Sequence, residues 1–539
     1  MTLLSIKPTI RQFFPAILVS IAILLSACSD GNNNDNNSNA QISTLGVPGA
    51  DNENTVAVPA AEIEGPIAGA PILVSTFINL PTLGYTAEKE YFVSGTANAY
   101  TNVNELRSDG KWQVEASEQA DYKTRIVVIR PVNPADFNGT VLVEWLNVSA
   151  GFDSPPDWLQ AHTELIRSGF AWVGVSAQKL GVDALLNGDA CDINPLCLNG
   201  DRYDNSGLNH PGDHFAYDIY SQVAQAIREP GGISPLGDLE VRHLIAAGES
   251  QSAGRMVTYV NAFAPIHALY DGYFIHSRTA GSAGLQQQSF CDIAIPTPEV
   301  VRVRDDLGIP ALMLQTETDL FILGSYPDNQ DDSLNFRLWE VAGTAHADLY
   351  TFLQGRTDAG TDPSIAAVKA DANPIPGIID CTIAVNAGPQ HFVVNAAIRA
   401  LNTWIVDGAP APMAERLEVA GEPPVFVKDA LENTRGGVRT PYVDTPIAIL
   451  EGEGQRQPPD FSEIEDTCEI NLDTVNFCFL SGTTELFDVA LLGSLYTDNA
   501  DYIEALNASA DEAVAKGFLL PEDAALIKAN AANSNIFAP

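Results

Sequence analysis

The chain reads VRHLIAAGESQSAGRMVTYVNAF from Val241 to Phe263, and this stretch decides the fold. The short apolar run that ends at Ala247 is typical of a strand buried in a parallel sheet. After Gly248, apolar residues recur at helical spacing as far as Phe263. A strand, a sharp turn at a serine and a helix are the context of a nucleophile elbow, in which small nearby residues leave the serine hydroxyl exposed above the sheet. We therefore expect Ser250 to be a nucleophile.

The turn departs from the pattern G-x-S-x-G at its last position, where Ser252 replaces the glycine. Ser252 is therefore a rival nucleophile, and a serine-rich N-cap on an ordinary strand–helix crossover is the simpler alternative. The flanking strand and helix favour the catalytic interpretation. We expect the amide N–H of Gln251, at the helix start, to point at the oxygen of a tetrahedral intermediate. The amide of Val148, which follows the strand over residues 140–145, is the second candidate donor.

A nucleophilic serine needs a general base, and the base needs an acid that fixes its tautomer. In a sheet of this kind the order along the chain is serine, acid, histidine, each after a successive strand. Asp319 and His346 occupy these two places. Glu317 is the alternative acid and His391, at the start of a later helix, is the alternative base. This chemistry requires no cofactor and no metal ion.

Apolar strands alternate with amphipathic helices through most of the chain, which predicts a mostly parallel sheet flanked by helices. We expect this core to span residues 66–410, with loop insertions. Residues 411–539 form a C-terminal extension that packs on the core as a lid or a flank.

Five motifs in this order resemble the α/β-hydrolase-domain family of bacterial secreted and actinobacterial proteins: FNGTVLVEWLNVSAG, GESQSAGR, QTETD, WEVAGTAHAD and GPQH. The resemblance implies an α/β-hydrolase fold over nearly the whole chain after residue 67. It places the nucleophile, the acid and the base on Ser250, Asp319 and His346. It implies hydrolase chemistry without naming a substrate.

The charge balance limits the partners. The chain has a formal net charge of −41 and a hydrophobic content of 45%. The hydrophobic content is sufficient for a large core, whereas the negative charge disfavours nucleic acid and anionic lipid surfaces as partners.

The first 27 residues predict export. Lys7 and Arg11 precede an apolar stretch over residues 13–25, and the sequence LSAC then ends at Cys28. This arrangement resembles a bacterial lipoprotein signal peptide, in which Cys28 becomes the lipidated first residue; a plain secretory peptide and a membrane anchor are the alternatives. Ser29 resembles the second residue of lipoproteins sorted to the outer membrane. Residues 28–65, rich in Asn, are expected to be a disordered tether.

Apart from Cys28, six of the seven cysteines remain, an even number in a chain expected to reach an oxidising compartment. The short spacings predict the pairs Cys191–Cys197 and Cys468–Cys478. Cys291 and Cys381 would then pair over a long range. Free buried thiols are the alternative.

These features together predict an extracytoplasmic serine hydrolase that acts on a small carboxylic ester through an acyl-enzyme on Ser250. We expect its only membrane contact to be the lipid anchor at Cys28, in the outer membrane of the bacterial cell envelope. The alternative is a catalytically inactive hydrolase body that serves as a binding or scaffold lipoprotein.

Replacement of Cys28 tests the predicted anchor. A Cys28→Ala variant lacks the lipidated residue, so we expect it to move from the membrane fraction to the soluble fraction of the cell envelope. The measurement is fractionation followed by immunodetection. If the variant stays with the membranes, the apolar stretch acts as an uncleaved anchor instead.

Overall fold

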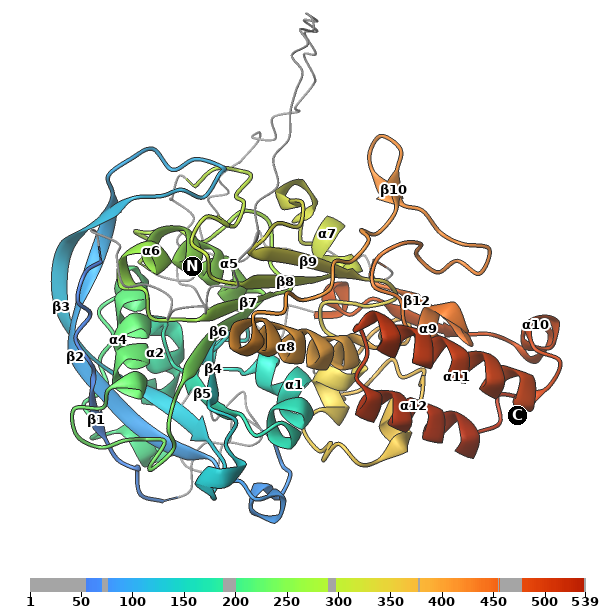
Figure 1. The fold of residues 1–539 in the computed structure, drawn as a ribbon, viewed down its shortest axis with the longest axis horizontal. Coiled ribbons are helices and arrows are strands. Elements are labelled where there is room, and N and C mark those ends of the chain that lie inside the picture. The colour runs from blue at the N-terminus through green and yellow to red at the C-terminus, as the bar shows by residue number, and fades with distance from the viewer. Residues whose placement is uncertain are drawn as a thin grey trace, which may run out of the picture. The chain divides into compact units, whose positions relative to one another are not determined.

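The computed structural model describes residues 55–69, 76–187, 200–288, 297–376, 379–453, 455 and 477–537. Its centre is a nine-stranded sheet with the order β1-β2-β3-β5-β4-β6-β7-β8-β9 (Figure 1). The strands are β1 (Glu62–Glu64), β2 (Lys89–Asn102), β3 (Val114–Ile129), β4 (Thr140–Trp145), β5 (Ala171–Val175), β6 (His243–Glu249), β7 (Gly272–His276), β8 (Ala311–Thr316) and β9 (Phe336–Val341).

The sheet is parallel from β5 through β4, β6, β7 and β8 to β9. The remaining strands, β1 to β3, are antiparallel and join the parallel part where β3 pairs with β5. The expected mostly parallel sheet is therefore present. The carboxyl ends of the parallel strands lie at one edge of the sheet, so the loops that follow β4, β6, β8 and β9 lie at this edge.

Helices cover both faces of the sheet, because successive side chains of a buried strand point to opposite faces. On β8, Leu312 and Leu314 pack with α1 (Pro156–Arg167) and α8 (Gln390–Asp407); these two helices lie in front of the sheet in Figure 1. Met313 faces the other way. The helices on that second side are α4 (Ala216–Arg228) and α5 (Gln251–Thr258). Further helices of the core are α2 (Lys179–Asn187), α6 (Ala264–His267) and α7 (Glu317–Phe321).

The C-terminal region packs on the core as a flank. Arg167 of α1 forms a bidentate ion pair with Asp523 at 2.6 and 2.8 Å, and Phe518 packs edge-on against Trp339 of β9. The region consists of β10 (Val419–Ala420), β11 (Val425–Phe426), α9 (Pro441–Asp444), β12 (Ala448–Glu451), β13 (Thr483–Leu486), α10 (Val489–Leu495), α11 (Asn499–Lys516) and α12 (Pro521–Asn533).

The packed body begins earlier than expected, inside the region assigned to the tether. Strand β1 pairs with β2, and the amide of Val56 donates to the carbonyl of Ile266. Strand β1 has only 3 residues, EIE, which are too few for its alternation to predict a strand. Residues 76–79 form no strand, and β3 starts at Val114.

The structure corrects the expected disulfide pairing, because Cys381 is bonded to Cys478 with a Cα–Cα distance of 5.6 Å. This bond excludes both Cys468–Cys478 and Cys291–Cys381. The two cysteines meet because their segments run side by side: Asn386 donates its amide to the carbonyl of Ser481 at 2.8 Å. The other five cysteines lie outside the described residues, and these are Cys28, Cys191, Cys197, Cys291 and Cys468.

Among the helices that the structure describes, none combines the length and the apolar composition needed to cross a membrane.

Removal of the disulfide gives a test of this pairing. The Cys381→Ala/Cys478→Ala double variant frees a loop with a sequence separation of 97. Because a disulfide restricts the unfolded chain, we expect the double variant to lose about 2–4 kcal/mol of unfolding free energy, measured by denaturant titration. Non-reducing peptide mapping of the unmutated chain should recover a Cys381–Cys478 peptide pair. Recovery of Cys468 linked to Cys478 would contradict the structure.

Candidate active site

Ser250 lies at the sharp turn between β6 and α5, in a backbone conformation that non-glycine residues rarely adopt. Its φ and ψ are 58° and −120°. The turn is fixed on the sheet by the amide of Ser250, which donates to the carbonyl of His276 on β7 at 2.9 Å. The side chain is partly exposed. The sequence feature that predicted an elbow is therefore a strained turn that lifts a hydroxyl out of the carboxyl end of the sheet.

The neighbours of the turn explain its composition. A Cβ atom on Gly248 would lie 2.8 Å from the carbonyl oxygen of Ser252, so only glycine fits where the helix folds back on the strand. Ser252, the rival nucleophile, is buried in the first turn of α5. Its Oγ contacts only the side chain of Gln251, at 3.5 Å, among the bonds of the described residues. The structure therefore does not bring Ser252 to the histidine.

The structure brings Ser250, His346 and Asp319 together in one chain of hydrogen bonds. His346 Nε2 lies 2.9 Å from Ser250 Oγ, and His346 Nδ1 lies 2.6 Å from Asp319 Oδ1. Asp319 is in α7, directly after β8, and His346 is in the loop after β9. The other carboxylate oxygen of Asp319 accepts the amide N–H of Thr316 at 2.6 Å, which holds the acid in place. An acid at Nδ1 leaves Nε2 as the atom that faces the serine.

Glu317, the alternative acid, serves another purpose. Its buried carboxylate accepts the amide N–H groups of Gly343 and Gly452 at 2.7 and 3.0 Å. Burial raises the pKa of Glu317, against the lowering effect of Lys428 and these amide bonds. Glu317 thus ties down the loop that carries His346 and does not reach the imidazole.

His391, the alternative base, lies away from this chain of hydrogen bonds. Its ring stacks on Tyr350 with centroids 3.6 Å apart, and neither ring nitrogen has a hydrogen-bond partner among the described residues. Burial, and then the charge of His162, lower the pKa of His391 well below its usual value. His391 is a neutral packing residue.

The two expected oxyanion donors lie at the edges of the elbow. Gln251 is the first residue of α5, where helical bonding leaves the amide N–H free. Val148 is buried in the loop after β4. The preceding Asn147 fixes that loop against the elbow, because its Nδ2 donates to the carbonyl of Glu249 at 3.1 Å. The hydrogen bond of Asn147 thus holds the loop of Val148 against the elbow.

Two acidic contacts of the site were missed by the sequence analysis. Glu249, directly before the nucleophile, places Oε1 at 3.2 Å from His346 Nε2. Its position at a strand end, inside the elbow motif, was a signal that could have found it. Asp157, at the start of α1, contacts His276 Nδ1 at 2.8 Å beneath the elbow. No local pattern in the sequence links these two residues.

The charges around the site set the protonation of its histidine. Burial lowers the pKa of His346, but the attraction of Glu249 and then of Asp319 outweighs it, so the pKa lies above its usual value. Burial raises the pKa of Glu249 to about 7, against the lowering effect of His346 and His276. The Glu249 carboxyl therefore titrates near neutral pH, beside a histidine whose protonated form its charge favours.

Within the part of the chain that the structure describes, no group of three or more His, Cys, Asp or Glu residues could hold a metal ion. His210 and Asp213, which are close in sequence, contact protein groups: His210 Nε2 lies 2.9 Å from the carbonyl oxygen of Ala177, and Asp213 accepts a hydrogen bond from the guanidinium of Arg255 at 3.0 Å.

The order of the sheet, with its antiparallel start and parallel remainder, and the elbow after β6 define an α/β-hydrolase fold. Sequence comparison leads to the same class. The family described as "Alpha/beta hydrolase domain" matches residues 56–529, and the chain belongs to this family. The match includes the C-terminal flank. The comparison with curated proteins gives no match.

Among solved structures, three esterases show distant similarity. The fungal esterases from Rhizomucor miehei are 13% identical, with 58% of this chain and 85% of theirs covered and a TM-score of 0.25. The carboxylesterase Cest-2923 from Lactobacillus plantarum is 12% identical, with 43% of this chain and 76% of its own chain covered and a TM-score of 0.26. The glucuronoyl esterase from Solibacter usitatus is 11% identical, with 51% of this chain and 72% of its own chain covered and a TM-score of 0.27.

Paired substitutions at Ser250 measure the backbone strain of the elbow. Ser250→Gly and Ser250→Ala both remove the hydroxyl, but only glycine adopts a positive φ without cost. We expect the glycine variant to be more stable than the alanine variant by about 1–2 kcal/mol in denaturant titrations. The same pair at Ser252, in ordinary helical backbone, is the control and should show the reverse order by about 0.5–1 kcal/mol. Equal stability of the two Ser250 variants would contradict a strained elbow.

Proposed function

We propose that the chain is a serine hydrolase that cleaves a carboxylic ester through an acyl-enzyme on Ser250. The observation that carries the proposal is the unbroken hydrogen-bond chain from Ser250 through His346 to Asp319 at a strained, partly exposed turn. Such a chain is the arrangement that makes a serine hydroxyl nucleophilic at neutral pH.

In the first half of the reaction, Ser250 Oγ attacks the carbonyl carbon of the ester while its proton passes to His346 Nε2. Asp319 holds the Nδ1–H of His346 and stabilises the imidazolium that forms. The negative oxygen of the tetrahedral intermediate accepts the amide N–H groups of Gln251 and Val148. The carbon–oxygen bond to the alcohol then breaks, and the proton on Nε2 goes to the departing oxygen.

In the second half, water repeats these steps on the acyl-enzyme: His346 takes a proton from water, the new oxygen bonds to the carbonyl carbon, and Ser250 leaves with the proton. The products are a carboxylic acid and an alcohol. An ester suits the site better than an amide, because an amine must be fully protonated before it leaves. The nearby carboxylate of Glu249 competes for the proton on Nε2.

The substrate we propose is a small ester without several negative charges. Glu249 and Asp319 both lie within hydrogen-bond distance of His346, and the whole chain has a net charge of −41. These charges repel polyanions.

The lipoprotein-like first 28 residues support a lipid-anchored protein of the cell envelope, with the catalytic body outside the cytoplasm.

Matched serine variants test this function. We expect Ser250→Ala to lower kcat/KM for short p-nitrophenyl esters by a factor of at least about 10⁴ and to abolish labelling by a fluorophosphonate probe. Ser252→Ala is the control and should keep both activities. Loss of labelling only in Ser252→Ala would move the nucleophile. A folded, unmutated protein that is silent in both assays would instead favour a binding or scaffold role.

A further inference from the structure

Glu249 is a buried carboxylate held in one position beside the proposed base. Its side chain is fixed from two sides: Oε2 accepts Nδ2 of Asn147 at 3.2 Å, and Oε1 lies 3.2 Å from His346 Nε2. The residue is 7% exposed. Glu249 is the last residue of β6 and lies directly before Ser250.

The contact between Glu249 Oε1 and His346 Nε2 is attractive only if one of these two atoms carries a proton. Asp319 accepts a hydrogen bond from the Nδ1–H of His346, so a neutral imidazole presents a single lone pair at Nε2. That lone pair faces two oxygens, Ser250 Oγ at 2.9 Å and Glu249 Oε1 at 3.2 Å. The serine can donate its own proton, but an ionised carboxylate has none to donate and would repel the lone pair. A proton on either Nε2 or Oε1 converts this repulsion into a hydrogen bond.

The surroundings of Glu249 favour retention of that proton up to neutral pH. The titratable groups that face it are His346 in the loop after β9, His276 at the end of β7, Asp157 at the start of α1 and Asp319 in α7. Burial raises the pKa of Glu249 to about 7, the two histidines lower it, and the two acids raise it. Glu249 in turn raises the pKa of His346, so the charge of each group affects the titration of the other.

We propose that Glu249 and His346 share one proton at Nε2, the position that must receive the proton of Ser250, and that Ser250 becomes nucleophilic only when this shared proton has left to solvent. The inference rests on the proposed function and adds a pH-dependent control to it. At a pH below that at which the pair loses this proton, Nε2 is already protonated or accepts a hydrogen bond from the protonated carboxyl. Above it, the lone pair is available to Ser250 alone. Glu249 is therefore a positioning residue that acts through His346.

The test is the pH dependence of the Glu249→Gln variant. Without the carboxylate, the largest contribution that raises the pKa of His346 is lost, so the acid limb of kcat/KM for a short p-nitrophenyl ester should move down by about 1 pH unit. The rate of Ser250 labelling by a fluorophosphonate should shift equally. Glu249→Ala, which cannot donate a hydrogen bond to Nε2, should move the limb in the same direction.

The control is Glu340→Gln. Glu340 is a buried glutamate on β9 whose pKa burial also raises, and its carboxylate accepts the amide of Leu417 at 2.7 Å rather than a group of the site. We expect its acid limb to coincide with that of the unmutated chain. An acid limb that stays in place in both Glu249 variants, while thermal unfolding shows them folded, would overturn the proposal.

A second readout separates this proposal from the proposed function. In a Ser250→Ala background, NMR of labelled histidine follows the titration of His346 without any turnover. We expect two coupled steps with Glu249 present, and one step at lower pH in Ser250→Ala/Glu249→Gln. This result would support the shared proton even if no ester were cleaved. A single, unshifted step in both proteins would refute it even in an active esterase.

Discussion

The backbone conformation at Ser250 is the constraint on which the rest of the structure depends. A φ of 58° with a ψ of −120° is held only because the surrounding elements leave no alternative. Strand β6 lies between β4 and β7 in the parallel sheet, and α5 folds back so closely that Gly248 has no room for a Cβ atom. The sheet and the two helical layers thus stabilise one turn, and the turn exposes one hydroxyl.

Buried carboxylates fix the loops around the elbow through hydrogen bonds to backbone amides. Glu317 binds the amides of Gly343 and Gly452, and Asp319 binds the amide of Thr316. Glu144 on β4 accepts the amides of Asp157 and Trp158 at the start of α1. Each acid replaces the water that a loop amide would otherwise bind. The acidic composition of the chain therefore includes a set of acids that fix the site, besides those on its surface.

The sequence was sufficient for those parts that local patterns determine. The apolar run before Gly248 predicted β6 to within about two residues at each end, and the helical spacing after it predicted the start of α5. Helix α5 itself ends at Thr258, and a π-helical turn continues it to Phe263. The order of strands led to Asp319 and His346. The disulfide was predicted wrongly because short spacing was taken for proximity, whereas Cys478 returns to Cys381 from the C-terminal flank.

Contacts made only by the tertiary fold were also missed. The pairing of Asp157 with His276 joins the start of α1 to the end of β7 and leaves no trace in either segment. Glu249 differs, since its place in the motif was visible. What the motif did not reveal is the direction of its side chain, which the hydrogen bond of Asn147 determines.

A second set of the same residue types shows why the elbow matters more than the residues. Ser221 Oγ lies 2.7 Å from His267 Nδ1, and His267 Nε2 lies 4.0 Å from Asp218. Ser221, however, is wholly buried in regular helix α4, where its Oγ also contacts the hydroxyl of Tyr259 at 2.7 Å.

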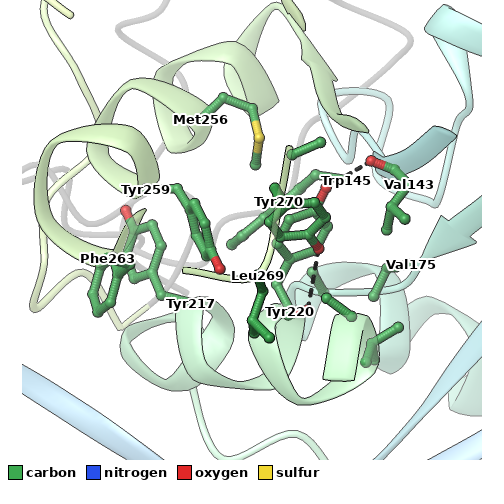
Figure 2. Packing of buried hydrophobic residues seen from close by; sticks show 14 of the residues in the cluster. Val143, Trp145, Val175, Tyr217, Tyr220, Met256, Tyr259, Phe263, Leu269 and Tyr270 are labelled. Atoms are coloured by element: carbon green, nitrogen blue, oxygen red, sulfur yellow. Dashed lines mark hydrogen bonds between the residues drawn. The ribbon is translucent and has the colours of Figure 1, made fainter. Parts of the chain in front are cut away.

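The surroundings of this second set are aromatic and closed. Figure 2 shows Tyr217, Tyr220, Tyr259 and Tyr270 packed together in this part of the core. Burial lowers the pKa of His267 to about 4, so the imidazole stays neutral and cannot hold the proton of an attacking serine. A serine, a histidine and an acid in contact are therefore not sufficient for catalysis. The turn at Ser250 adds what this buried set lacks: a hydroxyl raised to the surface and a histidine whose neighbouring charges favour its protonated form.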